Sequence, residues 1–376
     1  MTKKHSRLYN RRVLLRFNRS HFVAPASICV ALLALAHCSL AGLDDGSGGS
    51  DAGPSADGST LNDSRPPADA PPPEIPTLHV SDQGPIAALA ATNAFVAWQS
   101  GDDEMHACRT SDCTSSTTVD NEQRTIVGRV GFVGDTFYYL RADQPVRCEL
   151  PSSGTLRCVD NNGIGFDFEP KPVNSAVDLN GMFVSCEDGA KGTKGIYACD
   201  AVSGNGCGAW TANGTGSTSW RKIQSGTAAN AIALSGSEVF WAAPGTNGAI
   251  YRCPRAGCGG APTALAMNQL DPKSIAVNGS TVYWATSDGA IRSCTDDCAG
   301  GPKTLATGQS GARNIVFSSS MIYWANENAG TIMRCDPAAC SPVTLAEKID
   351  RPQQIAANDS RIYFSVNAGA IYSLTK

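Results

Sequence analysis

The sequence predicts an all-β fold, a β-propeller of seven four-stranded blades, because a unit of about 40 residues recurs along the chain. The clearest copies carry VYWA at 282–285 and IYWA at 322–325. Each unit holds four short apolar segments separated by turn residues and shows no helical periodicity, as a propeller blade does. Six blades remain the alternative if the copy around Cys186 is not a true blade.

Within one unit, the four expected strands follow in a constant order. The first is apolar and ends in a turn, as in SIAVNG at 274–279, and the second carries an aromatic anchor. Asn247-Gly248 and Asp288-Gly289 then predict tight hairpin turns, because these dipeptides supply positive φ angles. An Ile-led strand ending in cysteine comes third, as in IRSC at 291–294, and a Thr-Leu-Ala segment closes the unit.

Aligning the copies on the anchor position predicts the ring and its closure. The seven anchors are Trp98, Tyr139, Cys186, Trp241, Trp284, Trp324 and Phe364. The seventh copy stops before its closing strand, whereas Thr77–Val80 is similar to the Thr-Leu-Ala segments and precedes the first anchor. We therefore expect this N-terminal strand to complete the last blade, which removes the free edges of the array. The propeller is predicted to span 77–376.

The paired aromatics at 283–284 and 323–324 resemble the YWTD repeats of low-density-lipoprotein-receptor propellers. The Pro-x-x-Ile-Ala at 352–356 resembles the same repeat. The chain departs from it at the last two motif positions, which read Ala285-Thr286 and Ala325-Asn326. The resemblance implies an extracellular protein-binding propeller, and it transfers no ligand-binding residue.

The N-terminal part predicts export. Residues 1–37 combine seven basic residues and no acidic one with an apolar run from Phe22 to Ala36, as a signal peptide does. Leu35-Ala36-His37-Cys38 resembles the bacterial lipobox except at His37, so Cys38 is the predicted lipidation site. A Gly/Ser/Asp/Pro-rich linker, predicted to be disordered, completes 38–76. We expect a cell-envelope lipoprotein attached to the membrane only through its lipid, with a secreted soluble protein as the alternative.

Of the 15 cysteines, 12 form close pairs that recur with the blades. The predicted disulfides are Cys108–Cys113, Cys148–Cys158, Cys199–Cys207, Cys253–Cys258, Cys294–Cys298 and Cys335–Cys340. Each is expected to join the end of a third strand to the start of the fourth, where facing residues lie within disulfide range. No metal is expected, because the pairs belong to different blades and histidine is nearly absent. Cys186 is expected to be a buried, inert thiol.

Charge and composition limit the kinds of partner that we expect. Beyond the signal peptide the chain has 23 basic and 34 acidic residues, and this negative net charge argues against nucleic acid as a partner. We expect a non-catalytic, exported binding module for an envelope or extracellular protein or glycan, without cofactor. The alternatives are a metal-dependent lyase or lactonase and a structural envelope protein. Two residues before the first-strand Ile, four copies place polar side chains at one channel mouth, the expected binding site: Asn230, Lys273, Arg313 and Gln353.

Overall fold

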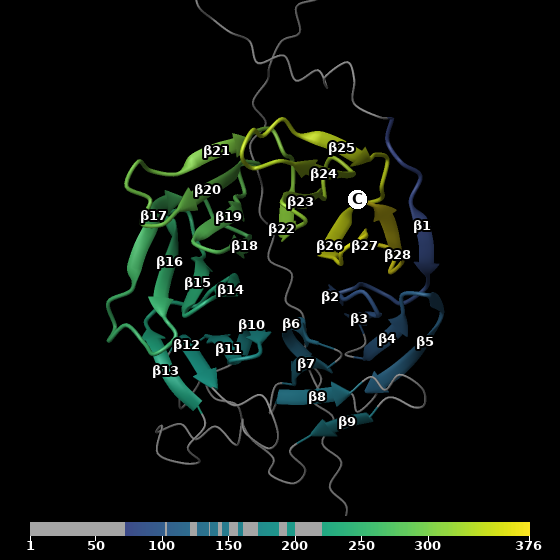
Figure 1. Ribbon diagram of the computed structural model, residues 1–376, viewed down its shortest axis with the longest axis horizontal. Coiled ribbons are helices and arrows are strands. Elements are labelled where there is room, and N and C mark those ends of the chain that lie inside the picture. The colour runs from purple at the N-terminus through teal and green to yellow at the C-terminus, as the bar shows by residue number, and fades with distance from the viewer. Residues whose placement is uncertain are drawn as a thin grey trace, which may run out of the picture. The chain divides into compact units, whose positions relative to one another are not determined.

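The computed structural model describes residues 72–101, 104–120, 126–134, 136–141, 145–149, 157–160, 172–187, 194–199 and 220–376. These residues form 28 strands in seven antiparallel four-stranded sheets. The sheets surround a central channel, and the strand that begins each sequence repeat lies nearest to it (Figure 1). The described residues contain no helix that is long and apolar enough to cross a membrane. The predicted seven-bladed β-propeller is confirmed.

Each of the first six blades consists of four strands that are consecutive in the chain. In blades 1 to 3 these are β2 (Ala88–Ala91), β3 (Phe95–Gln99), β4 (Met105–Arg109), β5 (Asp112–Asp120), β6 (Ile126–Val133), β7 (Thr136–Arg141), β8 (Pro145–Glu149), β9 (Arg157–Asp160), β10 (Pro172–Asp178), β11 (Gly181–Cys186), β12 (Gly195–Cys199) and β13 (Trp220–Ser225). In blades 4 to 6 they are β14 (Ala231–Ser235), β15 (Glu238–Ala243), β16 (Gly248–Pro254), β17 (Thr263–Gln269), β18 (Ser274–Asn278), β19 (Thr281–Ala285), β20 (Ile291–Thr295), β21 (Lys303–Ala306), β22 (Ala312–Ser318), β23 (Met321–Asn326), β24 (Thr331–Cys335) and β25 (Val343–Ala346).

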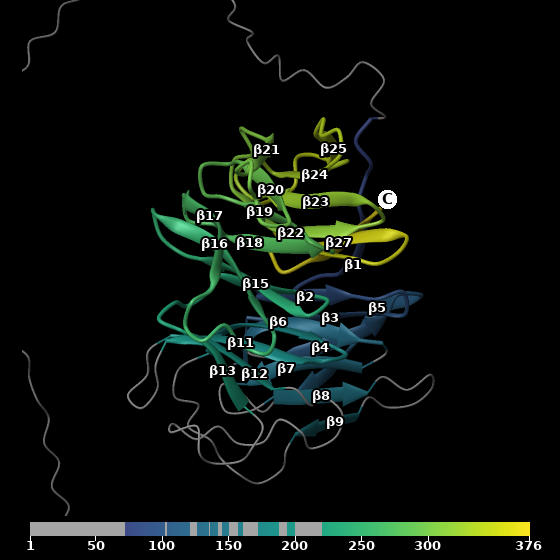
Figure 2. The ribbon, with the colours of Figure 1, turned by 60° about the vertical axis from the view of Figure 1, so that its left-hand side comes forward.

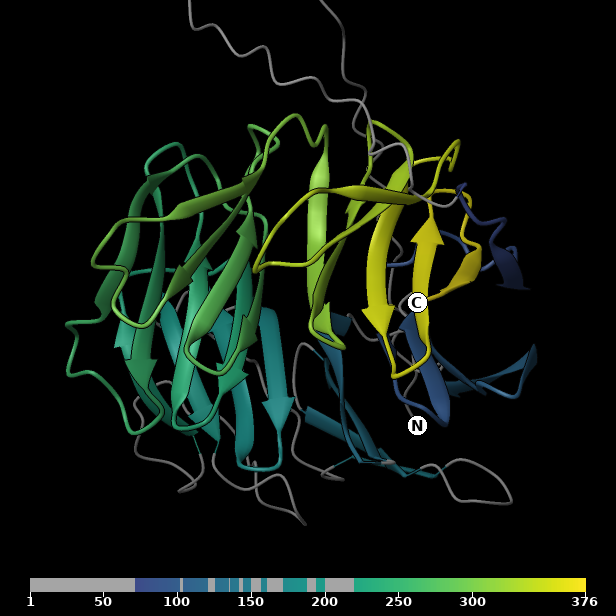
Figure 3. The same ribbon diagram turned by 45° about the horizontal axis from the view of Figure 1, so that its top comes forward.

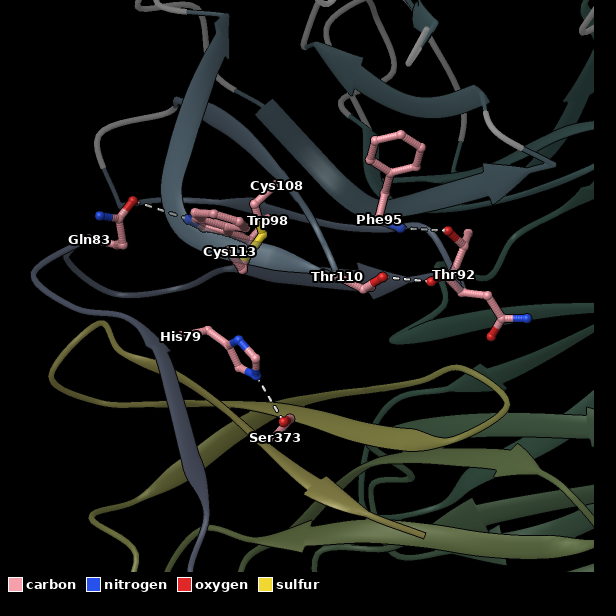
Figure 4. Close-up of a disulfide and its surroundings, with 10 residues drawn as sticks. His79, Gln83, Thr92, Phe95, Trp98, Cys108, Thr110, Cys113 and Ser373 are labelled. Atoms are coloured by element: carbon pink, nitrogen blue, oxygen red, sulfur yellow. Dashed lines mark hydrogen bonds between the residues drawn. A yellow bond between two sulfur atoms is a disulfide. The ribbon is translucent and has the colours of Figure 1, made fainter. Parts of the chain in front are cut away.

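Blade 7 contains both ends of the propeller. It consists of β26 (Pro352–Ala357), β27 (Arg361–Val366), β28 (Ile371–Thr375) and, as its outer strand, β1 (Thr77–Val80). The purple N-terminal strand lies beside the yellow C-terminal blade (Figure 3). His79 on β1 also bonds Ser373 on β28, with 2.8 Å between Nε2 and Oγ (Figure 4). The predicted closure by an N-terminal strand is therefore present.

The apolar core is divided among the seven junctions between blades, where neighbouring sheets pack face to face (Figure 2). The anchor side chain of each blade, aromatic in all blades but the third, is fully buried against the preceding blade. Trp284 of blade 5, for example, packs with Phe240 and Ile250 of blade 4. Since every junction uses the same position, the recurring anchor seen in the sequence is the main contact between sheets.

The third blade departs from the predicted alignment. In the other blades, the third-strand cysteine or its equivalent lies opposite the residue two positions before the anchor on the neighbouring strand. In blade 5, for example, Cys294 lies opposite Val282. In blade 3 Cys199 pairs with Met182, so the anchor is Val184 and the assignment of Cys186 to that position is wrong. Because this copy is longer than the others, the sequence alignment did not place its anchor correctly. Cys186 is a buried free thiol, and burial raises its pKa to about 12, which keeps the thiol protonated at neutral pH.

The two predicted hairpin glycines serve different purposes. Gly289 has a φ of 75°, as the predicted turn requires. Gly248 does not lie in the positive-φ region, which Gly245 occupies instead with a φ of 108°. A Cβ at Gly248 would lie 2.6 Å from the carbonyl oxygen of Ala243, so this glycine permits a close backbone approach.

Five predicted cysteine pairs are joined in the structure, with Cα–Cα distances of 4.0 to 5.5 Å. Cys199 is also disulfide-bonded, while its predicted partner Cys207 lies outside the described residues. Among these five pairs, only Cys148 and Cys158 face each other on paired strands. Cys258, Cys298 and Cys340 precede the fourth strand, so their disulfides close the connecting loop. Because disulfides persist in oxidising compartments, these pairs indicate an extracytoplasmic location.

Candidate functional site

A cavity of about 300 Å³ opens at the N-terminal ends of the innermost strands. Every blade contributes to its wall, which places it in the mouth of the central channel. Its lining is mainly amide and cationic side chains with small residues between them. The lining residues are Ala87, Gln99, Gly128, Arg129, Val173, Asn174, Asn230, Lys273, Asn314 and Gln354.

Three asparagines of this wall connect neighbouring blades. Asn174 Nδ2 donates to the carbonyl oxygen of Asn230 at 2.8 Å, and Asn230 Nδ2 donates to that of Pro272 at 3.0 Å. Asn314 Nδ2 donates in the same way to Gln353 at 2.7 Å. Each bond runs from one innermost strand to the start of the next. These contacts fix the starts of the innermost strands relative to one another at three junctions, and such pre-organisation lowers the entropic cost of binding a ligand.

The four sequence-predicted site residues divide into two pairs. Asn230 and Lys273 line the cavity, whereas Arg313 and Gln353 do not. Arg313 instead pairs with the carboxylate of Glu327, with 3.2 Å between Nη2 and Oε2. Gln353 lies beside Asn367, with 3.5 Å between Nε2 and Oδ1.

Strand irregularities explain this division. The pairing of β22 with β23 shifts register between Arg313 and Val316, and that of β26 with β27 shifts between Pro352 and Ile355. Each bulge inserts a residue, so the next position along the strand faces the channel. Asn314 and Gln354 therefore line the cavity in blades 6 and 7. The sequence shows both residues directly before the strand Ile, but it does not show the bulges that turn them inward.

Lys273 and Asp271 form an ion pair at the cavity edge. The Asp271 carboxylate also accepts from Asn230 Nδ2 at 3.1 Å and from the backbone N–H of Gly245 at 3.3 Å. Burial by itself would raise the pKa of Asp271, but the hydrogen bonds and the Lys273 charge together lower it below the ordinary value. At neutral pH Asp271 is charged and offsets the ammonium of Lys273.

Arg129 is the second cation of the wall, and sequence reasoning missed it. Its guanidinium, carried on β6, reaches Asn314 on β22, with 3.3 Å between Nη2 and Oδ1. Burial lowers the pKa of Arg129. Among the described residues, no carboxylate lies within 4.0 Å of this guanidinium. Its charge therefore remains uncompensated within that part of the protein.

The two histidines of the described residues lie outside the cavity wall. His106 stacks on the Trp98 indole, with ring centroids 5.5 Å apart, and has Ser100 Oγ at 3.3 Å. Burial lowers the pKa of His106, although the neighbouring Glu104 acts in the opposite direction. No group of three or more His, Cys, Asp or Glu side chains that could hold a metal ion occurs in the described part of the chain.

Comparison with solved structures supports the fold. A virginiamycin B lyase from Staphylococcus aureus aligns with 80% of this chain and 97% of its own, at a TM-score of 0.58 and 14% identity. A chain of a mitotic checkpoint complex aligns with 83% of this chain and 96% of its own, at a TM-score of 0.59 and 12% identity. The computationally designed Ika8 protein aligns with 80% of this chain and all of its own, at a TM-score of 0.54 and 12% identity. At such identities the similarity concerns the fold alone.

No protein-family model matches the chain, and no curated protein is similar to it in sequence. The class of the protein is therefore defined by its architecture. It is a seven-bladed β-propeller in which disulfides join third strands to the fourth strand or to the loop that precedes it.

Proposed function

We propose that this protein is an exported binding module that recognises its ligand, a protein or glycan, at the mouth of the central channel without catalysing a reaction. The observation that carries this proposal is the amide-rich and cationic cavity to which all seven blades contribute. Among the described residues of its wall there is no histidine, cysteine, aspartate or glutamate to act as an acid, base or nucleophile. The YWTD resemblance, which implies an extracellular binding propeller, adds support.

The rigidity of the wall also favours recognition. Disulfides close the outer loops, and three asparagines connect neighbouring innermost strands. A preformed site loses little conformational entropy when a ligand binds, so its polar contacts contribute more fully to affinity. The mouth is concave, and its convergent amide and cationic groups can fix the orientation of a polar ligand.

The proposal is tested by capturing ligands from native envelope and medium on the immobilised full chain with its disulfides formed. One variant carries Lys273→Ala and Gln354→Ala, which change the wall. A matched control carries Arg313→Ala and Gln353→Ala, which change neighbouring residues outside it. We expect a protein or glycan that binds the wild type and the control but not the wall variant. Equal binding by both variants, or no bound ligand at all, would contradict a channel-mouth site.

We further propose that Cys38, which lies outside the described residues, is lipidated and anchors the propeller to the cell envelope. The lipobox-like residues before it and the basic, apolar leader support this address. Cys38→Ser should move the protein from the membrane fraction to the soluble fraction, and mass spectrometry of the wild type should find acyl groups on Cys38. A wild-type protein that is soluble and unacylated would favour the secreted form.

A further inference from the structure

The backbone of Arg129 is fixed by two hydrogen bonds to the hydroxyl of Ser175 on β10. Its N–H donates to Ser175 Oγ at 3.2 Å, and its carbonyl oxygen accepts from the same hydroxyl at 3.0 Å. The preceding Gly128 has a φ of 83°, and a Cβ there would lie 2.7 Å from Ser175 Oγ. The strand can therefore come this close to β10 only with glycine at 128. The side chain of Arg129 then extends toward Asn314 on the far side of the channel.

The charges of the wall do not cancel. Lys273 is paired with Asp271, but Arg129 has only a neutral amide oxygen as a side-chain partner among the described residues. A half-buried guanidinium without a carboxylate has lost hydration that one hydrogen bond does not replace. A ligand carboxylate would restore a charge-assisted, two-point contact with it. With one uncompensated positive charge, the cavity favours a monoanion.

Around Arg129 the wall offers partners for hydroxyl groups. The side-chain amide of Gln354 makes no hydrogen bond within the described part of the protein and can both donate and accept. Lys273 uses one of its three N–H donors on Asp271 and has others to offer. The cavity of about 300 Å³ is at the small end of ligand sites, a size that suits a single sugar ring.

We propose that the channel cavity binds a sugar acid of monosaccharide size, whose carboxylate pairs with Arg129 and whose hydroxyls contact Gln354 and Lys273. This inference rests on the proposed binding function and names its ligand class. The anion can be a free sugar acid or the terminal residue of an acidic glycan, because both present the same carboxylate and ring.

Titration calorimetry of the full chain tests this directly, with D-glucuronate as the probe, D-glucose as its neutral counterpart and inorganic phosphate as a different anion. We expect glucuronate to bind at least about tenfold more tightly than glucose or phosphate. Arg129→Gln should remove that advantage, leaving glucuronate no tighter than glucose. Arg313→Gln, which changes a mouth arginine already paired with Glu327, is the matched control and should leave both affinities unchanged. A glucuronide-terminated oligosaccharide that binds more tightly than glucuronate identifies the glycan as the source, and equal affinity identifies the free acid.

The ligand class is overturned if glucuronate fails to bind up to about 10 mM, if phosphate binds more tightly, or if Arg129→Gln binds glucuronate as well as the wild type. Each variant is checked for an unchanged melting temperature. Should Arg129→Gln not fold, Arg129→Lys replaces it: this change keeps the charge but loses the planar fork, and it should weaken glucuronate alone. If a captured ligand is lost in the wall variant but glucuronate does not bind, the proposed binding function is supported and the sugar acid as its ligand class is contradicted.

Discussion

The junction between blades 4 and 5 and the junction between blades 3 and 4 use the same fold with different polar contacts. At the first, Trp284 Nε1 donates to Gln269 Oε1 at 3.1 Å, so the buried indole is satisfied. At the second, Trp241 is equally buried, yet its Nε1 has no hydrogen-bond partner among the described residues. Its apolar contacts with Phe183 and Ile196 of blade 3 are still present. Apolar burial is thus the common requirement, and the polar contact is optional.

The origin of the difference is one residue. Trp98, Trp284 and Trp324 each bond a glutamine 15 positions earlier. The residue 15 positions before Trp241 is Gly226, which has no side chain. Gly226 does occupy the equivalent place, because its N–H donates to the carbonyl oxygen of Lys194 as that of Gln309 does to Gly289.

The junction between blades 3 and 4 has another contact instead. Arg255, in the disulfide-closed loop of blade 4, pairs through both terminal nitrogens with Asp178 of blade 3. Its guanidinium also lies 5.4 Å from the ring centroid of Phe183. An ion pair therefore connects blades 3 and 4, whereas a buried hydrogen bond between an indole and an amide connects blades 4 and 5.

Removal of the buried tryptophan, which both junctions share, should destabilise the protein most. Trp284→Ala and Trp241→Ala should each lower the free energy of unfolding by about 3–5 kcal/mol, because each leaves a cavity in an apolar interface. Denaturant unfolding under non-reducing conditions measures this. A much smaller loss for Trp241→Ala would show that the junctions do not depend equally on apolar burial.

Removal of the ion pair between Arg255 and Asp178 should have the second-largest effect on stability. Arg255→Ala is expected to cost about 2 kcal/mol, because it leaves the half-buried Asp178 carboxylate without its partner. Arg252→Ala, which removes the longer pair with Glu238 at 3.5 Å within blade 4, is the control and should cost less. Similar losses of unfolding free energy in both variants would show that the pair between Arg255 and Asp178 contributes no more than an ion pair within one blade.

The same pair predicts a pH dependence. Burial alone would raise the pKa of Asp178, but Arg255 and the backbone N–H groups of Asn180 and Gly181 together lower it below the ordinary value. A carboxyl with a lowered folded-state pKa stabilises the protein above its unfolded pKa, and this contribution disappears as pH falls through the folded pKa. The difference in unfolding free energy between wild type and Asp178→Asn should therefore shrink on acidification below about pH 4. A constant difference would contradict the ion pair as its source.

The smallest expected effect isolates the indole bond. Gln269→Ala should cost about 1–2 kcal/mol, since it leaves Trp284 Nε1 buried and unpaired as Trp241 Nε1 already is. Trp284→Phe should likewise cost about 1 kcal/mol more than Trp241→Phe, because only the former loses a hydrogen bond. Equal costs for the two Trp→Phe changes would show that the bond to Gln269 contributes nothing measurable.

Repeat spacing in the sequence was enough to predict the propeller architecture. A period of about 40 residues, the aromatic anchors and the separated closing strand at Thr77–Val80 are local patterns that only a ring of sheets satisfies. The cysteine pairs were equally visible, because both partners lie within one blade. These features depend on spacing along the chain, which a sequence displays directly.

Contacts between side chains on opposite sides of the ring could be identified only from the folded structure. Arg129 and Asn314 are far apart in the sequence and belong to different blades, so no repeat alignment brings them together. The bulges in β22 and β26 turned Asn314 and Gln354, rather than Arg313 and Gln353, toward the channel. A shift of one residue reverses the face of a strand. The site therefore depends on strand bulges, which leave no local signature in the sequence, and on contacts across the ring, which spacing along the chain does not specify.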